Sequence, residues 1–183
     1  MFGRQDTPFS GVMEPIYGDQ TDEDGKSYVD LALPQVEDPG RPLEAQVTVR
    51  VAEGSGRPVE RRMTAEVVPA AAMIGVKPLF DGVVREGTEA HFQLIGIGTD
   101  LQPTPMKVKW LLTRIETDYQ WYQSYGNWSW EPVIYRTPVT EGEAALGDAP
   151  AEVFGAVDWG QYELSVERTD GTLAATSTTF WAG

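Results

Sequence analysis

Cysteine is absent from the 183-residue chain, and histidine occurs only once, as His91. Without cysteine, the sequence excludes disulfide frameworks, zinc–thiolate and iron–sulfur sites, cysteine nucleophiles and redox-active CxxC motifs. A single histidine also excludes metal motifs that need two histidines in one chain, such as HExxH. These absences leave the compartment open, because secreted bacterial domains often lack cysteine.

Basic residues are also scarce. Lysine and arginine number 14 against 28 aspartate and glutamate residues, which gives a formal net charge of −14. A protein that binds nucleic acid needs a basic surface to displace counterions from the phosphates. Binding to nucleic acid, and to an anionic membrane surface, is therefore disfavoured.

Long apolar stretches are missing too. The longest uncharged apolar run, residues 67–76, is interrupted by Pro69 and is too short to span a bilayer. Residues 1–6 are not followed by the apolar stretch of a signal peptide. If the sequence is a piece of a longer protein, this missing signal carries no information about the compartment.

What the sequence does contain is a repeated alternation of apolar and polar residues. In residues 43–51 the odd positions are apolar and the even positions mostly polar, as expected for a half-buried antiparallel strand. Residues 59–68 continue an extended pattern, so 43–68 is predicted to form a β-hairpin. Residues 27–33 are predicted to form an earlier strand. A helical period of 3.6 is not sustained anywhere.

A second group of alternating segments follows residues 69–73, which break the alternation and are the predicted domain boundary. These segments indicate roughly seven short strands over about 110 residues, the pattern of an immunoglobulin-type β-sandwich. The first segment is short for such a domain, so either residues 1–26 contain poorly patterned strands or the sequence begins inside a domain. The later strands are predicted at residues 90–94, 108–115, 128–139, 151–154, 161–167 and 172–181, with a hairpin tip at 124–127.

A local motif supports the sandwich. Asp158, Gly160 and Tyr162 have the D-x-G-x-Y spacing of a tyrosine corner, in which the tyrosine hydroxyl bonds to a backbone group near the start of a late strand. Leu164 occupies the position two residues further on, where antibody domains have a cysteine. Tyr162 is therefore predicted to be buried, with its hydroxyl bonded to the backbone.

Motifs for ligands fail on inspection. Residues 25–27 resemble the end of a phosphate-binding loop, but the upstream glycine is replaced by Gln20, and the acidic residues 22–24 would repel phosphate. As a calcium loop, the same stretch has Leu31 in place of the bidentate glutamate. A turn rich in aspartate and glycine is the preferred interpretation of residues 20–25. No metal site and no cofactor are predicted.

Catalytic motifs fail as well. His91 alternates with apolar neighbours and is predicted to face outward beside Gln93, or to lie under a neighbouring loop. A Ser–His–Asp triad would have to use this histidine, yet no G-x-S-x-G motif occurs. Pairs of carboxylates are not excluded by the sequence, but small β-sandwiches seldom build the cleft that a glycosidase needs. The chain is therefore predicted not to be an enzyme and to have no catalytic residue.

Aromatic residues gather in one stretch, which has two interpretations. It is either a sugar-stacking or partner-binding platform, or a long hairpin stabilised by aromatic pairs across its strands. The hairpin interpretation predicts that the tryptophans split between the two faces, with Trp110, Trp128 and Trp130 covering the core. The candidate interaction surface comprises Tyr119, Trp121, Tyr122, Tyr125, Trp128 and Trp130, and Tyr135 lies nearby.

Several longer motifs follow one another along the chain. In the second segment they are residues 74–82, 118–122, 128–133, 158–164 and 178–183. Together they resemble the middle macroglobulin-like domains of bacterial alpha-2-macroglobulins. In the first segment, the turn 21–26, the Arg-Pro-Leu sequence at 41–43 and the hairpin 43–68 resemble the second half of the preceding macroglobulin domain.

This resemblance implies a fold and a role. Residues 1–69 would be the C-terminal part of one macroglobulin-like β-sandwich domain, and residues 70–183 a complete one. The family consists of large, secreted or lipid-anchored periplasmic proteins in which cleavage of a bait segment triggers a conformational change that traps the protease. Many members carry an internal Cys-Gln thioester, which cannot lie in a chain without cysteine.

The resemblance therefore predicts a non-catalytic structural fragment of a protease-trapping inhibitor. Its partners would be neighbouring macroglobulin domains of the parent chain and, for the full-length protein, target proteases. Its location would be the periplasm or the outside of the cell, with lipid anchoring through the parent chain as one arrangement. The alternative is a carbohydrate- or peptide-binding β-sandwich module that uses the aromatic residues of 119–135.

Overall fold

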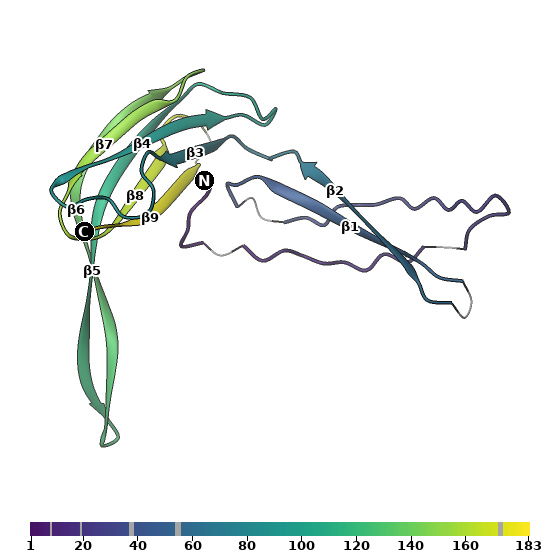
Figure 1. Ribbon diagram of the computed structural model, residues 1–183, viewed down its shortest axis with the longest axis horizontal. Coiled ribbons are helices and arrows are strands. Elements are labelled where there is room, and N and C mark those ends of the chain that lie inside the picture. Colours follow the sequence, from purple (N-terminus) through teal and green to yellow (C-terminus); the bar gives the residue numbers. More distant parts are fainter. Residues whose placement is uncertain (8, 19, 37–38, 54–55, 172–173) are drawn as a thin grey trace.

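The computed structural model describes all residues except 8, 19, 37–38, 54–55 and 172–173. The described residues form nine β-strands and no helix, so the all-β prediction is confirmed. A β-sandwich lies at one end of the molecule, and a long arm extends sideways from it (Figure 1). None of the described segments is a helix long and apolar enough to cross a membrane.

Seven strands build the sandwich as two antiparallel sheets of three and four strands, in the orders β3-β4-β7 and β6-β5-β8-β9. This number agrees with the roughly seven strands predicted, although β5 and β6 are much longer than expected. Residues 172–173 of the last predicted strand lie outside the described residues. The bounds are β3 Met73–Pro78, β4 Thr88–Ile97, β5 Met106–Ser124, β6 Asn127–Leu146, β7 Ala151–Val157, β8 Gly160–Arg168 and β9 Ala175–Ala182.

The core lies between the two sheets because alternate residues of each strand point inward. Phe92 and Leu94 of β4 face Leu112 of β5 and Leu164 of β8, and each of the four is at most 1% exposed. Phe180 of β9 lies edge-on to Phe92, with ring centroids 5.4 Å apart. The alternation seen in the sequence is thus the pattern of one buried and one exposed face.

The tyrosine corner is present as predicted. Tyr162 on β8 is 2% exposed, and its ring stacks on Phe180. The backbone N–H of Asp158 donates a hydrogen bond to the Tyr162 hydroxyl over 3.0 Å. This bond fixes the turn between β7 and β8 against the end of the core.

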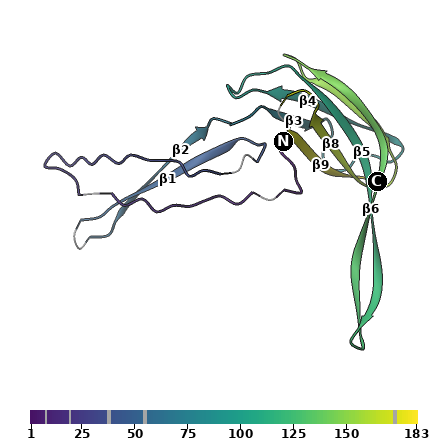
Figure 2. The ribbon, with the colours of Figure 1, turned by 180° about the vertical axis from the view of Figure 1, so that it is seen from behind.

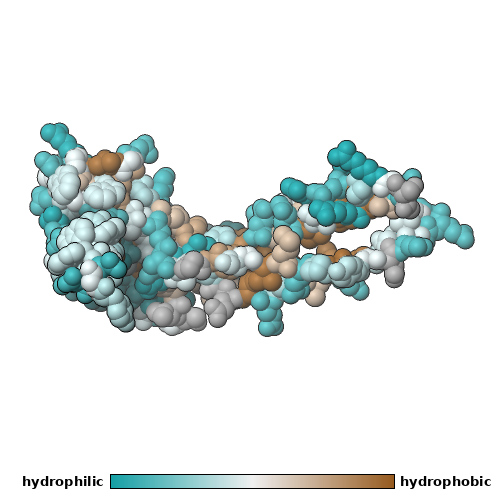
Figure 3. All heavy atoms as spheres, turned by 90° about the horizontal axis from the view of Figure 1, so that it is seen from below, coloured by the Kyte–Doolittle hydropathy of each residue, from teal (hydrophilic) through white to brown (hydrophobic). Residues whose placement is uncertain are grey.

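The arm contains strands β1 (Leu43–Val51) and β2 (Val59–Val67), which form the predicted hairpin. Opposite residues share a face, so one face carries apolar side chains such as Val47 and Met63 (Figure 3 shows brown, apolar residues along the arm). The other face is charged, and there Glu60 accepts hydrogen bonds from Arg50 and Arg62. These bonds and the two positive charges lower the pKa of the Glu60 carboxyl.

The predicted strand at residues 27–33 is wrong. These residues belong to no strand, although the stretch lies in the arm (Figures 1 and 2). Tyr28 is 89% exposed, and the alternating apolar residues Leu31 and Leu33 are also exposed. Alternation produces a strand only where a neighbour supplies ladder hydrogen bonds, and no strand pairs with this stretch. The preceding turn does form, because the Asp22 carboxylate accepts bonds from the N–H groups of Asp24 and Lys26.

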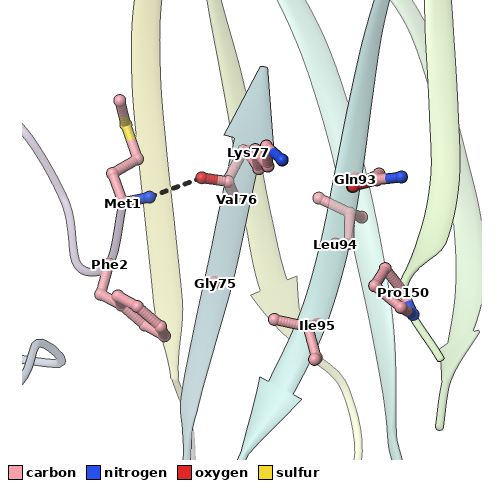
Figure 4. Close-up of a pocket in the computed structure, with 9 residues that line it drawn as sticks. All are labelled: Met1, Phe2, Gly75, Val76, Lys77, Gln93, Leu94, Ile95 and Pro150. Atoms are coloured by element: carbon pink, nitrogen blue, oxygen red, sulfur yellow. Dashed lines mark hydrogen bonds between the residues drawn. The ribbon is translucent and has the colours of Figure 1, made fainter. Parts of the chain in front are cut away.

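Residues 1–5, here called the strap, leave the arm and pack on the sandwich. Met1 exchanges two backbone hydrogen bonds with Val76 of β3: the Met1 nitrogen donates to the Val76 carbonyl over 2.6 Å (dashed in Figure 4), and the Val76 N–H donates to the Met1 carbonyl over 2.9 Å. Phe2 pairs with Gly75, where an added Cβ would lie 3.1 Å from the Phe2 ring. The strap thus adds a short antiparallel partner to the edge of β3. A shallow hollow beside it is lined by Met1, Phe2, Gly75, Val76, Lys77, Gln93, Leu94, Ile95 and Pro150.

The strap also reaches β9. The Gly3 N–H donates to the Thr176 hydroxyl over 3.0 Å, and this hydroxyl donates to the Ile74 carbonyl over 2.6 Å. The Gln5 side-chain oxygen accepts hydrogen bonds from the backbone N–H and the hydroxyl of Thr179. The strap is therefore held to the sandwich through strands from both sheets, a connection that the sequence alone did not suggest.

Tyr162→Phe should lower the free energy of unfolding by about 1 kcal/mol, because the Asp158 N–H loses its partner. Denaturant titration of the variant measures this loss as a shift of the midpoint. Tyr125→Phe is the matched control, since Tyr125 is fully exposed and its hydroxyl has no partner among the described residues. An unchanged midpoint for Tyr162→Phe would contradict a stabilising corner.

Thr176→Val should cost about 1–3 kcal/mol, because a side chain of nearly the same shape leaves the Gly3 N–H and the Ile74 carbonyl without their partner in a buried site. Hydrogen exchange should also become faster at the amides of residues 1–5. Thr137→Val, at an exposed position of β6, is the control. Equal losses for the two variants would show that the strap contributes no stability.

Candidate interaction surface on the β5–β6 hairpin

The predicted aromatic residues lie on a hairpin that projects from the sandwich. Strand β5 pairs with β8 only along residues 108–115, whereas its pairing with β6 continues to the tip. Residues 116–135 therefore form a two-stranded ribbon that extends beyond both sheets (Figures 1 and 2). Tyr125 and Gly126 turn the chain with φ angles of 49° and 81°, the left-handed conformation that tight two-residue hairpins require. The tip predicted at residues 124–127 is thus confirmed.

The register places four aromatic rings on one face of this ribbon. Trp121 lies directly opposite Trp130, and Tyr119 lies opposite Pro132. Directly opposite residues of an antiparallel pair project to the same side, as do residues two apart on one strand. Tyr119, Trp121, Trp128 and Trp130 therefore share one side of the ribbon, here called the aromatic face. The predicted split of the tryptophans between two faces is wrong for the three in the ribbon.

The aromatic face is open to solvent. Its four side chains are between 54% and 69% exposed, so Trp128 and Trp130 do not cover the core as predicted. Trp110 does pack against the core, where its ring lies over Gly142 of β6. Tyr119 and Trp130 touch edge to face, with centroids 5.1 Å apart and planes at 78°. The hairpin thus has aromatic contacts across its strands, as one interpretation required, and exposed rings, as the other required.

The other two predicted residues lie elsewhere on the hairpin. Tyr122 projects from the opposite side, because it pairs with Ser129, and Tyr125 is fully exposed at the tip. The side that carries Tyr122 is here called the acidic face. Its charged members are Glu116, Asp118 and Glu131.

The charges of the ribbon are largely unbalanced. Glu116 forms an ion pair with Arg114 over 3.3 Å. Asp118 and Glu131 have no ion-pair partner in the part of the chain that the structure describes. At the base of the hairpin, the hydrogen bond and the charge of Glu141 raise the pKa of the Lys109 ammonium above its usual value. The ribbon beyond this base therefore combines apolar rings with net negative charge.

His91 lies on the outer face of the sandwich, as predicted. Its Nδ1 lies 2.8 Å from Glu152, its Nε2 lies 3.4 Å from Glu89, and the ring stacks on Phe154. All four side chains are on an open sheet surface rather than in a cleft. The described residues contain no group of three or more histidine, aspartate or glutamate side chains placed to hold a metal ion.

Comparison with known proteins assigns the chain to a family. The sequence model described as "Bacterial macroglobulin domain 6" matches residues 75–183, and the one described as "Bacterial Alpha-2-macroglobulin MG5 domain" matches residues 1–69. The chain belongs to the bacterial alpha-2-macroglobulin family. The second match includes the strap, so in this family member the strap links residues matched as MG5 to the domain that follows.

Among curated proteins, the chain is 33% identical to an alpha-2-macroglobulin of Xylella fastidiosa (strain 9a5c) over 149 residues. The alignment covers 78% of this chain but only 9% of the relative, so the chain is a small part of the length of such a protein. The resemblance to macroglobulin domains of bacterial alpha-2-macroglobulins, expected from the sequence motifs, is therefore confirmed.

Solved structures agree with this assignment. Escherichia coli alpha-2-macroglobulin activated by porcine elastase superposes with a TM-score of 0.62 and 28% identity, covering 81% of this chain and 14% of that one. The native conformation of the E. coli protein gives a TM-score of 0.63 at 23% identity, over 91% of this chain and 12% of that one. The fold is thus that of macroglobulin domains.

Trp130→Ala should change the free energy of unfolding by no more than about 0.5 kcal/mol, because the ring is exposed and lies beyond the sandwich. Leu112→Ala, at the buried part of the strand β5, should instead cost about 2–5 kcal/mol. Thermal or denaturant unfolding compares the two. A loss of several kcal/mol for Trp130→Ala would show that the hairpin supports the core, against its exposed geometry.

Proposed function

We propose that the chain is a non-catalytic structural segment of a protease-trapping bacterial alpha-2-macroglobulin. The observation that carries this proposal is the match of two consecutive macroglobulin domains along the chain. A relative with 28% identity in its solved structure, the E. coli protein, is described as activated by porcine elastase. A protein that responds to a protease in this way needs domains that pass a movement from the cleaved segment to the rest of the molecule.

The strap is suited to such a mechanical role. It joins the segment matched as MG5 to β3 and β9 of the next domain through backbone hydrogen bonds and a buried hydroxyl. Residues 68–72, between β2 and β3, form a second connection between the same two parts. Two connections restrict rotation far more than a single linker, so the two domains would turn together when the parent changes shape.

The partners and the location follow from the same proposal. The chain would contact neighbouring macroglobulin domains of its parent, and the full-length protein would meet its target proteases in the periplasm or outside the cell. Attachment of the parent to the cell envelope by a lipid is compatible with this arrangement. The chemistry that captures a protease would be supplied by other parts of the parent, since this chain has no cysteine for a thioester.

The full-length protein tests this proposal when it is incubated with porcine elastase. Trapping should abolish most cleavage of a large substrate such as casein and preserve cleavage of a small chromogenic peptide, because a caged protease admits only small molecules. Thr176→Val in the full-length protein should weaken this effect, whereas Thr137→Val should not. Equal inhibition towards both substrates, or none, would contradict a trapping function.

A second candidate function is the binding of a partner by the hairpin. The specific observation in its favour is the aromatic face, where four rings lie exposed on one side of a ribbon. Exposed apolar patches of this kind mark interaction surfaces more often than chance. The hairpin could serve this function within a structural segment, so the two candidates are compatible.

A further inference from the structure

We propose that the aromatic face of the β5–β6 hairpin binds an extended polypeptide segment that carries arginine or lysine side chains. This inference rests on the second candidate function, the binding of a partner by the hairpin. It concerns the class of partner, and four features of the ribbon support it.

The first feature is the spacing of the rings. Trp128 and Trp130 are two residues apart on β6, as are Tyr119 and Trp121 on β5. Along a strand, such residues repeat every ~6.6–6.8 Å. Alternate side chains of an extended peptide repeat at the same distance. A peptide laid along the ribbon can therefore place successive side chains over successive rings.

The second feature is charge. The ribbon, residues 116–135, contains Glu116, Asp118 and Glu131 and no lysine or arginine. Glu116 is paired with Arg114 just outside the ribbon, so Asp118 and Glu131 carry the unbalanced charge. The ribbon is one layer thick, so these carboxylates lie across a single layer from the rings, and their field extends roughly 8–10 Å in physiological salt. The negative potential attracts a cationic segment. Guanidinium and ammonium groups also bind favourably over the faces of tryptophan and tyrosine.

The third feature is the orientation of the rings. Tyr119 and Trp130 meet at 78°, so they do not form the continuous flat surface on which a polysaccharide chain stacks. A peptide tolerates such an arrangement because each of its side chains meets one ring separately.

A second copy of this chain would bring like charges together, and an anionic membrane would be repelled by the same carboxylates.

The fourth feature is the β6 edge of the ribbon. β6 is the edge strand of its sheet. Pro132 and Pro138 have no backbone N–H, so each removes one hydrogen-bond donor from this strand. Addition of a strand to this edge by backbone pairing is therefore unfavourable. The opposite edge, β5 beyond Ile115, has no neighbouring strand in the described part of the chain. We place recognition on the side chains of the aromatic face, where a cationic side chain meets a ring within the negative potential of the acidic face behind it.

The test uses the full chain and dye-labelled twelve-residue peptides of alternating arginine and serine, with binding followed by fluorescence anisotropy. Citrulline in place of arginine keeps the shape and removes the charge. We expect saturable binding of the arginine peptide, weaker binding of the citrulline peptide, and weaker binding at high salt. Asp118→Asn combined with Glu131→Gln should also weaken binding of the arginine peptide.

Trp121→Ala should weaken binding of the arginine peptide roughly two- to fivefold, the loss expected for one exposed ring beneath a cation. Trp159→Ala is the matched control, because Trp159 is also 64% exposed but lies on the sandwich at the β7–β8 turn. Circular dichroism confirms that both variants are folded. Trp128→Ala should also weaken binding of the arginine peptide, because Trp128 lies on the same face. Equal losses for Trp121→Ala and Trp159→Ala would remove the hairpin as the binding surface.

Other outcomes separate this inference from the function on which it rests. Equal binding of the arginine and citrulline peptides, lost in Trp121→Ala, would overturn the cationic partner but keep a binding hairpin. If soluble glycans bound instead, and this binding were lost in Trp121→Ala, the cationic partner would again be overturned and a binding hairpin kept. Dimerisation of the chain through the hairpin, detected by sedimentation, would replace the peptide with a second copy. Saturable binding of none of these probes would overturn both the inference and the second candidate function.

Discussion

The hydrogen bonding of β5 is the constraint on which the rest of the structure depends. Along residues 108–115 this strand has neighbours on both sides, β6 and β8, and its inward side chains enter the core. Beyond Ile115, β5 no longer pairs with β8, and β6 is its one remaining neighbour among the described residues. The same strand thus supplies the middle of a sheet and one half of a projecting ribbon. Because a ribbon has no second layer, the side chains on both of its faces are left in water.

This division explains why the aromatic residues differ in role along one strand pair. Trp110 packs against the core because it lies in the part of β5 that is covered by the other sheet. Trp121 and Trp130 lie further along, where no sheet faces them; they are opposite each other in the register, and Trp130 contacts the ring of Tyr119. The chemistry of the residue is the same in both places. Its surroundings are set by how far the neighbouring strand extends.

The sequence was sufficient for the features that depend on local pattern. Alternation identified β1, β2 and most of the sandwich strands, and the D-x-G-x-Y spacing identified the buried Tyr162. It was insufficient where a second segment decides the outcome. Residues 27–33 alternate but have no pairing strand. The sharing of one face by Trp121 and Trp130 depends on the register between two strands, and that register follows from the length of the turn at Tyr125 and Gly126.

The strap was the least predictable part, because its residues show no period and its partners lie more than 70 residues away. Its place on the molecule has a consequence for solubility. β3 is an edge strand, and an uncovered edge offers free N–H and C=O groups to the strands of other molecules. The strap occupies this edge at Gly75 and Val76. Any change of shape that lifted the strap would expose a surface prone to aggregation, so a parent protein that moves at this joint needs another segment to take the place of the strap.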